Sequence, residues 1–407
     1  MKIKLLKFEQ ADMMHENSIT KICFFEGNND TIYADVKERV LKLLELNPWL
    51  ASTLIKEKKE TMMAFDETKT PEELVDKILF QENDMCIDES MDYAQMQKAI
   101  EKHVVSTGSK LLKTGDFVFR VTLITHKINN TSGLALIFSL SHVPADGYTY
   151  YKLLNAFFDP AQMTAMNYTR NFEAVDKIEE FIGKTNYKFT SSAPMIVNVL
   201  MNLLFGKKVQ YFSRFVDEER VDVIKDAYAN IAEKEFPFIS TNDVITSSHC
   251  KATNSRLGLS AINLRNRIEG MGSEDAGNYE FVLLLDKKHY NTPEAIRKVL
   301  STKGQFEPND GTMPGIIEAL KSNITLVTNA SSFIEDYKLG DLKQILHLTI
   351  FNPKSIFCDF AAIYKAKDGR RAIMYFGKKT STQNYLANSE LGESVSESLF
   401  NNNLKHI

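Results

Sequence analysis

A histidine and an aspartate four residues apart are the residues best suited to chemistry in this 407-residue chain. They stand in the segment Ser-His-Val-Pro-Ala-Asp-Gly, which runs from Ser141 to Gly147. Histidine can take up and return a proton near neutral pH, so the spacing allows general acid–base catalysis by His142. The competing interpretation is a histidine that only fills a hydrogen-bonded place in the core.

The elements on either side of His142 would hold it in a fixed position. The run 134–140 is short, apolar and rich in β-formers, which predicts a buried strand. A second strand is expected over 117–125, and the turn-rich residues 129–133 would join the two as antiparallel neighbours. After Gly147, the apolar residues fall on one helical face. His142 is therefore expected between the end of a strand and the start of a helix.

A His-x-x-x-Asp-Gly segment in this setting resembles the acyltransferase superfamily that contains chloramphenicol acetyltransferase, peptide-synthetase condensation domains and the plant BAHD acyltransferases. Weaker similarities follow in the family's order. Residues 240–247 resemble its Ser-x-x-Asp-x-Leu/Ile-x-Ala pattern, 260–267 resemble the strand that ends in Val-Asp-x-Arg-x-Arg, and Gly277-Asn278 matches its Gly-Asn. The BAHD signature Asp-Phe-Gly-Trp-Gly is absent, which argues against a typical plant enzyme but not against the superfamily.

The resemblance implies an α/β fold of two lobes, each a mixed sheet flanked by helices, with the active site in a tunnel between them. It implies transfer of an acyl group, expected to be acetyl, from coenzyme A to the hydroxyl or amine of a small or lipophilic acceptor. His142 would take the acceptor's proton and return it to the departing thiolate. Acyl-CoA would be a co-substrate, with no permanently bound cofactor.

The resemblance also assigns roles to three hydroxyl side chains. Thr328 is the candidate donor to the oxyanion of the tetrahedral intermediate. Ser240 and Thr241 are expected near the pantetheine arm of coenzyme A. Helix capping and strand-end hydrogen bonding are the alternatives for all three.

Three further residues would build the frame of the site. Asp146 is expected to turn away from the substrate and pair with Arg265 of the second lobe, which would fix the histidine loop. A surface arginine is the alternative for Arg265. Gly147 would let the backbone turn sharply into the following helix.

The chain divides into a first lobe over 1–165, a crossover over 166–206 without a regular core pattern, and a second lobe over 207–407. In the second lobe we expect a strand at 322–330, a hairpin of 356–364 with 371–376, and a last helix at 389–400. The longest apolar run, 193–205, predicts a buried or channel-lining helix, or one that makes peripheral contact with a membrane.

The composition of the chain limits the kinds of partner that it can bind. A net charge of −4 and the lack of basic residues interleaved with aromatics argue against nucleic acid. The four cysteines are scattered and no histidine spacing suits zinc, so we expect no metal site. The first residues are too interrupted by lysine for a signal-peptide core, which favours a cytoplasmic protein. We also expect a monomer without an obligate protein partner.

Two other functions remain open. A condensation-type acyltransferase that takes its acyl group from a carrier protein would use the same histidine, but such domains usually carry a second histidine directly before it. Here that place holds Ser141. A non-catalytic binding protein on the same scaffold is the other alternative.

Overall fold

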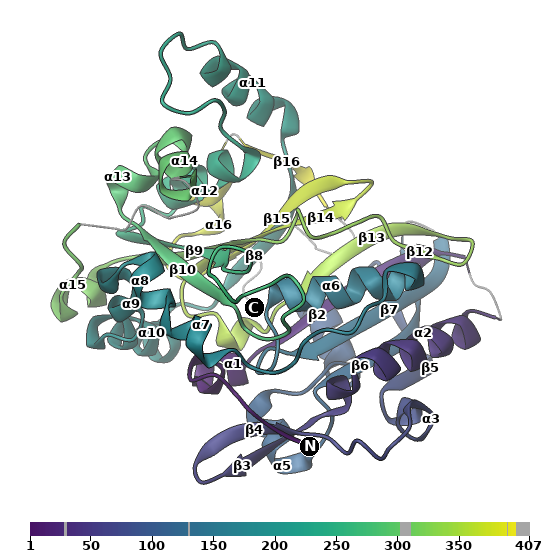
Figure 1. The fold of residues 1–407 in the computed structure, drawn as a ribbon. Coiled ribbons are helices and arrows are strands. Elements are labelled where there is room, and N and C mark those ends of the chain that lie inside the picture. The colour runs from purple at the N-terminus through teal and green to yellow at the C-terminus, as the bar shows by residue number, and fades with distance from the viewer. Residues whose placement is uncertain (28–30, 129–130, 302–310, 389, 396–407) are drawn as a thin grey trace.

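The computed structural model describes residues 1–27, 31–128, 131–301, 311–388 and 390–395. Two large mixed sheets dominate it (Figure 1). The first has six strands in the order β12 (Lys338–Leu339), β13 (Leu342–Ile350), β2 (Ser18–Glu26), β7 (Thr131–Ser141), β6 (Phe119–Ile128) and β5 (Leu79–Asp88). The second has seven, in the order β10 (Glu280–Leu285), β9 (Leu257–Asn263), β11 (Ile324–Asn329), β14 (Asp359–Lys367), β15 (Arg370–Gly377), β8 (Gln210–Val216) and β16 (Leu391–Ser394). A small sheet of β1 (Lys2–Lys4), β4 (Glu60–Ala64) and β3 (Thr53–Glu57) completes the strands.

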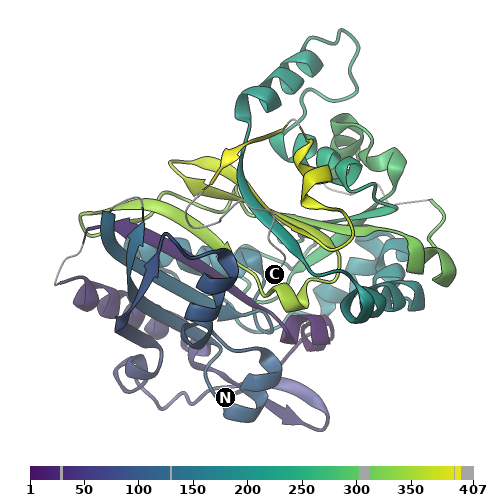
Figure 2. The same ribbon diagram turned by 180° about the vertical axis from the view of Figure 1, so that it is seen from behind.

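Helices of the first half are α1 (Asp12–His15), α2 (Ile32–Leu46), α3 (Pro71–Leu74), α4 (Tyr93–Ile100), α5 (Gly108–Thr114) and α6 (Gly147–Phe158). Both α2 and α6 lie along one face of the six-stranded sheet (Figures 1 and 2). Apolar residues on one side of α2, such as Val36 and Val40, are fully buried in the core that this sheet shares. The predicted strand, turn and helix around His142 are therefore present as β7, a short loop and α6.

The predicted crossover over 166–206 is mostly helical. It contains α7 (Phe172–Asp176), α8 (Ile178–Ile182), α9 (Lys184–Thr190) and α10 (Ala193–Phe205). Ile178 and Ile182 pack with Leu264 and Leu283 of the second half, so these helices form a layer beside β9 and β10. The sequence analysis expected the helix over 193–205 but missed α7, α8 and α9, because each is short and has too few apolar positions to show a period.

The second half adds α11 (Glu218–Ala229), α12 (Thr241–Ala252), α13 (Lys287–Tyr290), α14 (Pro293–Ser301), α15 (Ile316–Lys321) and α16 (Thr382–Leu386). Alternate residues of β14 divide between two cores. Phe360, Ala362 and Tyr364 join the core of the first sheet, whereas Ala361 and Ile363 pack under α11, α12 and α16. One face of the seven-stranded sheet therefore shares a core with the first lobe.

One strand pair crosses between the halves. β13 runs antiparallel to β2, with His347 opposite Cys23 and Leu348 opposite Ile22. Figure 1 shows it beside β2, which in turn pairs with β7. The division at residues 165 and 207 stays a prediction, but 338–350 belong to the sheet of the first lobe. A strand pattern in the sequence does not specify which sheet receives the strand.

Two other expectations have different outcomes. The hairpin of β14 and β15 is present, as is the strand β11. The predicted last helix is wrong where the structure describes it, because Leu391–Ser394 form β16, the edge strand that pairs with β8. Arg214 donates to the carbonyl of Gly392 at 3.0 Å, so pairing with an open sheet edge outweighs local helix preference. Residues 389 and 396–400 of that prediction lie outside the described residues.

Candidate functional site

The loop after β7 is held by both lobes. The His142 backbone N–H donates to the carbonyl of Asn17 at 3.2 Å. From the other lobe, the Asn278 amide donates to the carbonyls of His142 and Val143, each at 3.0 Å. Asn278 belongs to the Gly277-Asn278 pair that the sequence analysis singled out. Its function in the structure is to attach the histidine loop to the opposite lobe.

The His142 imidazole is 22% exposed and faces the first residue of β10. Its Nε2 lies 3.7 Å from Oε1 of Glu280, which is 29% exposed. That distance is too long for a hydrogen bond but short enough for the two charges to interact. Nδ1 is buried and has no hydrogen-bond partner among the residues that the structure describes. Nε2 is thus the nitrogen at which a proton could be exchanged.

Asp146 and Arg265 form the ion pair that the sequence analysis expected. Both side chains are fully buried. Arg265 Nη1 donates to Asp146 Oδ2 at 2.7 Å and Nη2 donates to Oδ1 at 3.2 Å, so the contact is bidentate. The pair joins the loop before α6 to the segment after β9.

Each end of this ion pair has further partners. The backbone N–H groups of Thr149 and Tyr279 donate to Asp146 at 2.8 and 2.9 Å, and the first of these bonds caps α6. Arg265 also donates to the carbonyls of Asp275 and Gly277, both at 2.9 Å. Both oxygens of Asp146 are therefore engaged by Arg265 and by backbone N–H groups.

A second buried ion pair, which the sequence analysis missed, supports the same loop. Arg170 Nε donates to Glu9 Oε2 at 2.9 Å, and both side chains are fully buried. Arg170 also donates to the carbonyl of Pro144 at 2.8 Å, inside the histidine loop. Glu9 accepts from the Asn278 backbone N–H at 3.0 Å. No local pattern marks a glutamate and an arginine 161 residues apart as partners.

Glu280 is the other site residue that the sequence analysis did not name. Burial raises the pKa of its carboxyl to about 7, helped by the nearby charge of Asp146, whereas His142, Arg265 and a Gly147 backbone hydrogen bond oppose the shift. The available signal was its position in the sequence. Glu280 comes two residues after the Gly277-Asn278 pair, which leads into β10. Glu280 can therefore change its charge near neutral pH beside the imidazole.

Gly147 does not have the conformation that was expected. It is the first residue of α6 and is not among the glycines with positive φ. A Cβ at this position would meet no atom within 4 Å. The sharp turn at Gly147 is thus wrong, because Asp146 makes the change of direction as an extended N-cap residue. The glycine of the site with a positive φ is Gly277, at +147°, where a residue with a side chain would be strained.

The three predicted hydroxyl residues lie in the seven-stranded lobe. Thr328 is half-buried in β11, opposite Ala362 of β14. Ser240 caps α12 in a capping box with Asp243, which is the alternative role considered for it. Thr241 is the first residue of that helix. Asn329 donates to Asn242 at 2.9 Å, so the end of β11 and the start of α12 are neighbours. Contacts of these hydroxyls with a substrate stay predictions.

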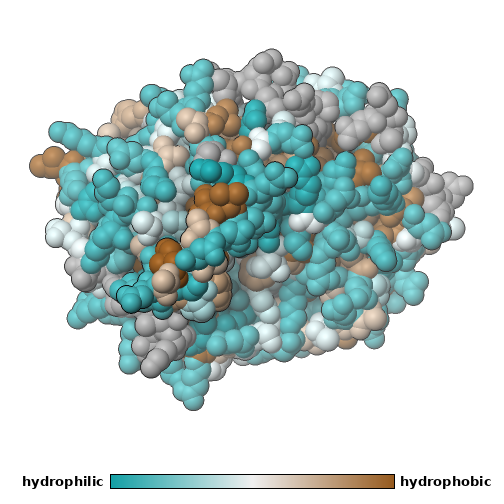
Figure 3. All heavy atoms as spheres, turned by 90° about the horizontal axis from the view of Figure 1, so that it is seen from above, coloured by the Kyte–Doolittle hydropathy of each residue, from teal (hydrophilic) through white to brown (hydrophobic). Residues whose placement is uncertain are grey.

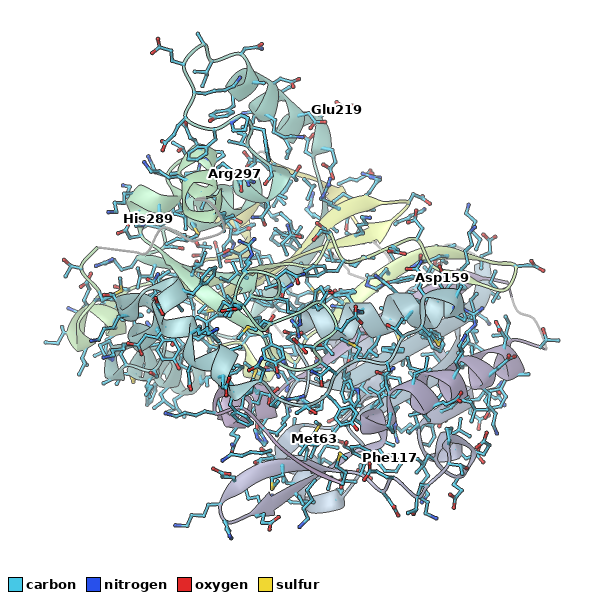
Figure 4. All side chains as sticks on the ribbon, in the orientation of Figure 1. Met63, Phe117, Asp159, Glu219, His289 and Arg297 are labelled. Atoms are coloured by element: carbon cyan, nitrogen blue, oxygen red, sulfur yellow. The ribbon has the colours of Figure 1, made fainter. Side chains whose placement is uncertain are left out.

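The start of α12 is anchored to the next helical layer. Asp243 accepts from Arg297 of α14 at 2.7 Å, and Figure 4 labels Arg297 within that layer.

Two cavities, of about 930 and 350 Å³, are lined by residues of the second half, and His142 does not line either of them. The tunnel between the lobes stays a prediction. Among the described residues, no group of His, Cys, Asp or Glu side chains has the arrangement of a metal site.

Comparison with known proteins identifies the fold. No protein-family model and no curated protein sequence matches the chain. Solved structures do match along nearly the whole chain. TRI101 from F. graminearum, complexed with coenzyme A and T-2 mycotoxin, has a TM-score of 0.65 at 13% identity and covers 97% of this chain and 100% of its own. Vinorine synthase has a TM-score of 0.58 at 15% identity, with 97% and 94% covered.

A third match is polyketide synthase associated protein 5 from Mycobacterium tuberculosis, with a TM-score of 0.57 at 15% identity and coverage of 96% and 98%. The predicted fold class is confirmed: the chain has the two-lobed α/β fold of these proteins. At such low identity the match concerns the fold, so the chemistry has to be argued from the residues of this chain.

Proposed function

We propose that the chain is an acyl-CoA-dependent acyltransferase that transfers an acyl group, acetyl in the first instance, to the hydroxyl or amine of a small or lipophilic acceptor. The observation that carries the proposal is the position of His142 and of the loop that holds it. Its Nε2 lies 3.7 Å from Glu280 of the opposite lobe, and the ring belongs to a loop fixed by two buried ion pairs. The TRI101 structure, with coenzyme A and a mycotoxin bound together, supports a site for two substrates on this fold.

The reaction needs one base that later acts as an acid. The acceptor oxygen or nitrogen attacks the thioester carbonyl while its proton passes to Nε2 of His142. The tetrahedral intermediate then collapses, the carbon–sulfur bond breaks, and the imidazolium returns the proton to the thiolate of coenzyme A. The products are the acylated acceptor and free coenzyme A, and no acyl group is attached to the enzyme.

Other residues would stabilise the charges that appear on this path. Ionised Glu280 lies 3.7 Å from Nε2 and favours the imidazolium that forms when His142 takes the proton. Thr328 is the proposed donor to the oxyanion, and Ser240 and Thr241 are proposed to lie beside the pantetheine arm. Asp146 and Arg265 hold the loop and take no proton.

Free acyl-CoA is favoured over a carrier protein as the donor by the residue before the histidine. Ser141 is fully buried, and its hydroxyl accepts from the Val143 backbone N–H at 3.3 Å. It therefore shapes the loop and presents no second imidazole to a substrate. We further propose that the enzyme acts as a cytoplasmic monomer. Among the described residues, no helix has the length and apolar character needed to cross a membrane.

The test is incubation of the purified chain with acetyl-CoA and a panel of alcohols, amines and sterols, with product detection by mass spectrometry. His142→Ala should lower turnover of any accepted substrate by about 100-fold or more, the usual contribution of a general base. The unfolding midpoint of the variant should stay near that of the wild type, because the ring is partly exposed and its Nδ1 has no hydrogen-bond partner among the described residues. Wild-type turnover by the folded variant would refute the mechanism. Saturable coenzyme A binding without turnover of any acceptor would favour a binding protein.

A further inference from the structure

Helix α10 has its polar and apolar sides reversed relative to an ordinary surface helix. Its buried side carries Asn198 and Asn202 besides Met195, and Asn198 donates to the carbonyls of Ala319 in the neighbouring α15 and of Ser322 directly after it. Asn202 in turn donates to Asn198 at 3.1 Å. These bonds fix the helix with its apolar residues outward, so their exposure follows from specific packing.

The exposed side chains make one apolar surface with α15. Leu204 and Phe205 are 71% and 74% exposed, and Ile317 of α15 is 74% exposed. Of the fifteen exposed large hydrophobic residues among those described, nine lie on these two short helices: Ile196, Leu200, Met201, Leu203, Leu204, Phe205, Ile316, Ile317 and Leu320. The interpretation of 193–205 as a buried or channel-lining helix is thus wrong for this side. Seen from above, the surface of the molecule is mostly hydrophilic, with scattered apolar side chains (Figure 3).

Lysines lie at the ends of both helices. Lys207 and Lys208 follow Phe205 and line the 350 Å³ cavity together with Lys378 and Lys379. Lys321 ends α15, and Lys379 donates to the carbonyl of the next residue, Ser322. Lys321 and Lys379 also line the 930 Å³ cavity, together with Lys287, Lys288 and one carboxylate, Asp286. Arg256 lines it too, but its charge is paired with Glu318 of α15. This concentration of cations contrasts with a chain whose net charge is −4.

We propose that α10 and α15 dock on the surface of a bilayer that contains anionic lipids, with the apolar side chains in the interface and the lysines against the headgroups. The combination of an apolar helix face with flanking lysines is what such a surface binds. A protein partner fits less well, because lysine is depleted in protein interfaces whereas nearly all the cations here are lysines. A helix of 13 residues spans about 20 Å, too short for the roughly 30 Å hydrocarbon core, so it lies on the membrane.

The experiment is flotation of the full chain with vesicles of phosphatidylcholine alone and of phosphatidylcholine mixed with phosphatidylserine. We expect binding to the mixed vesicles, weaker binding to the neutral ones, and loss of the difference when the salt concentration rises from about 0.1 M to about 0.5 M. Equal binding to both vesicle types, or binding to neither, would overturn the proposal.

Two double variants separate the apolar and charged contributions. L204S/F205S should weaken binding to mixed vesicles by about tenfold or more, since two large exposed side chains lose their apolar contact. K207Q/K208Q should weaken it by about 25-fold, because each lysine near an anionic surface contributes about fivefold. All four residues are exposed, so the fold should persist, which the unfolding midpoint checks.

Matched controls lie elsewhere on the surface. V223S/I231S removes two exposed apolar side chains at and just beyond α11, and K58Q/K59Q removes two adjacent exposed lysines between β3 and β4. Neither should change vesicle binding by more than about twofold.

If the controls weaken binding as much as the α10 variants, the surface is not the docking site. If the wild type instead forms dimers without binding vesicles, and L204S/F205S makes it monomeric, the surface is a self-association interface and the proposal is wrong. The vesicle assay does not depend on acyl transfer.

Discussion

Two carboxylates flank the histidine loop, and their surroundings give them opposite properties. Asp146 is fully buried but has an arginine and two backbone N–H groups as partners. Glu280 is 29% exposed and interacts with His142 at 3.7 Å, and burial raises its pKa to about 7. Partners matter more than exposure here: the more buried group is the fixed structural anion, and the less buried group is the one that titrates.

The same contrast extends to the two glycines nearby. Gly277 lies on the Asp146 side, where its carbonyl accepts from Arg265 and from the Asp146 backbone N–H. Gly147 lies on the Glu280 side and is next to open space. Substitutions on the Asp146 side should therefore damage stability, and substitutions on the Glu280 side should change activity.

The largest expected effect comes from breaking the Asp146–Arg265 pair. Arg265→Ala should lower the free energy of unfolding by about 3–5 kcal/mol, because it leaves a buried carboxylate without its counter-ion. Asp146→Asn should also destabilise, since an amide donor would face the N–H groups that now meet a carboxylate oxygen. Denaturant unfolding of both singles and the double variant measures the coupling, which should be roughly 0.5–3 kcal/mol. Strict additivity would mean that the two residues act independently.

Gly277→Ala should have the next largest effect. The residue has a φ of +147°, and a Cβ there would lie 3.0 Å from the Tyr279 ring and 3.3 Å from the Arg170 guanidinium. Strain of this kind costs about 1–3 kcal/mol, so the unfolding midpoint should fall. Because the substitution disturbs both buried ion pairs, turnover should fall with it. An unchanged midpoint would show that the loop can relax without cost.

The parts of this site that could be predicted from sequence are those with local or family signals. His142 and Asp146 lie in one short segment, and Arg265 ends a recognisable strand pattern. Glu9 and Arg170 could not be paired, since their contact depends on how the N-terminal segment packs between the lobes. The pairing of β13 could not be predicted either, because its apolar residues predict that it is buried but not the sheet in which it pairs. β5 was missed because its exposed, charged residues conceal a strand at the edge of the sheet.

Glu280→Gln should lower turnover at pH 8 by about tenfold, which corresponds to about 1.4 kcal/mol of lost stabilisation of the imidazolium. The difference from wild type should narrow below pH 7, where Glu280 itself becomes protonated. A pH–rate profile of both proteins checks this, and a loss that is equal at all pH values would indicate a purely structural role.

The free energy of unfolding should also depend on pH through Glu280, but it should fall as pH rises, whereas the contribution of Glu280 to turnover rises. The folded chain keeps the Glu280 proton up to about pH 7, whereas the ordinary pKa is 4.5, so the unfolded state binds fewer protons between these values. The contribution of Glu280 to the free energy of unfolding therefore falls as pH rises from about 4.5 to about 7. Comparison of denaturant unfolding at the two ends of this range should show a smaller fall in Glu280→Gln.

The smallest effect on stability is expected for Gly147→Ala. The residue begins α6, its φ is compatible with any side chain, and the added Cβ would meet no atom within 4 Å. Alanine favours a helix over glycine by up to about 1 kcal/mol, so the free energy of unfolding should stay constant or rise slightly. Activity can still change, because the methyl group would enter open space beside Glu280, where the proposed mechanism puts the acceptor. A higher KM with an unchanged unfolding midpoint would support that placement, whereas a destabilisation beyond about 1 kcal/mol would mean that the turn needs glycine after all.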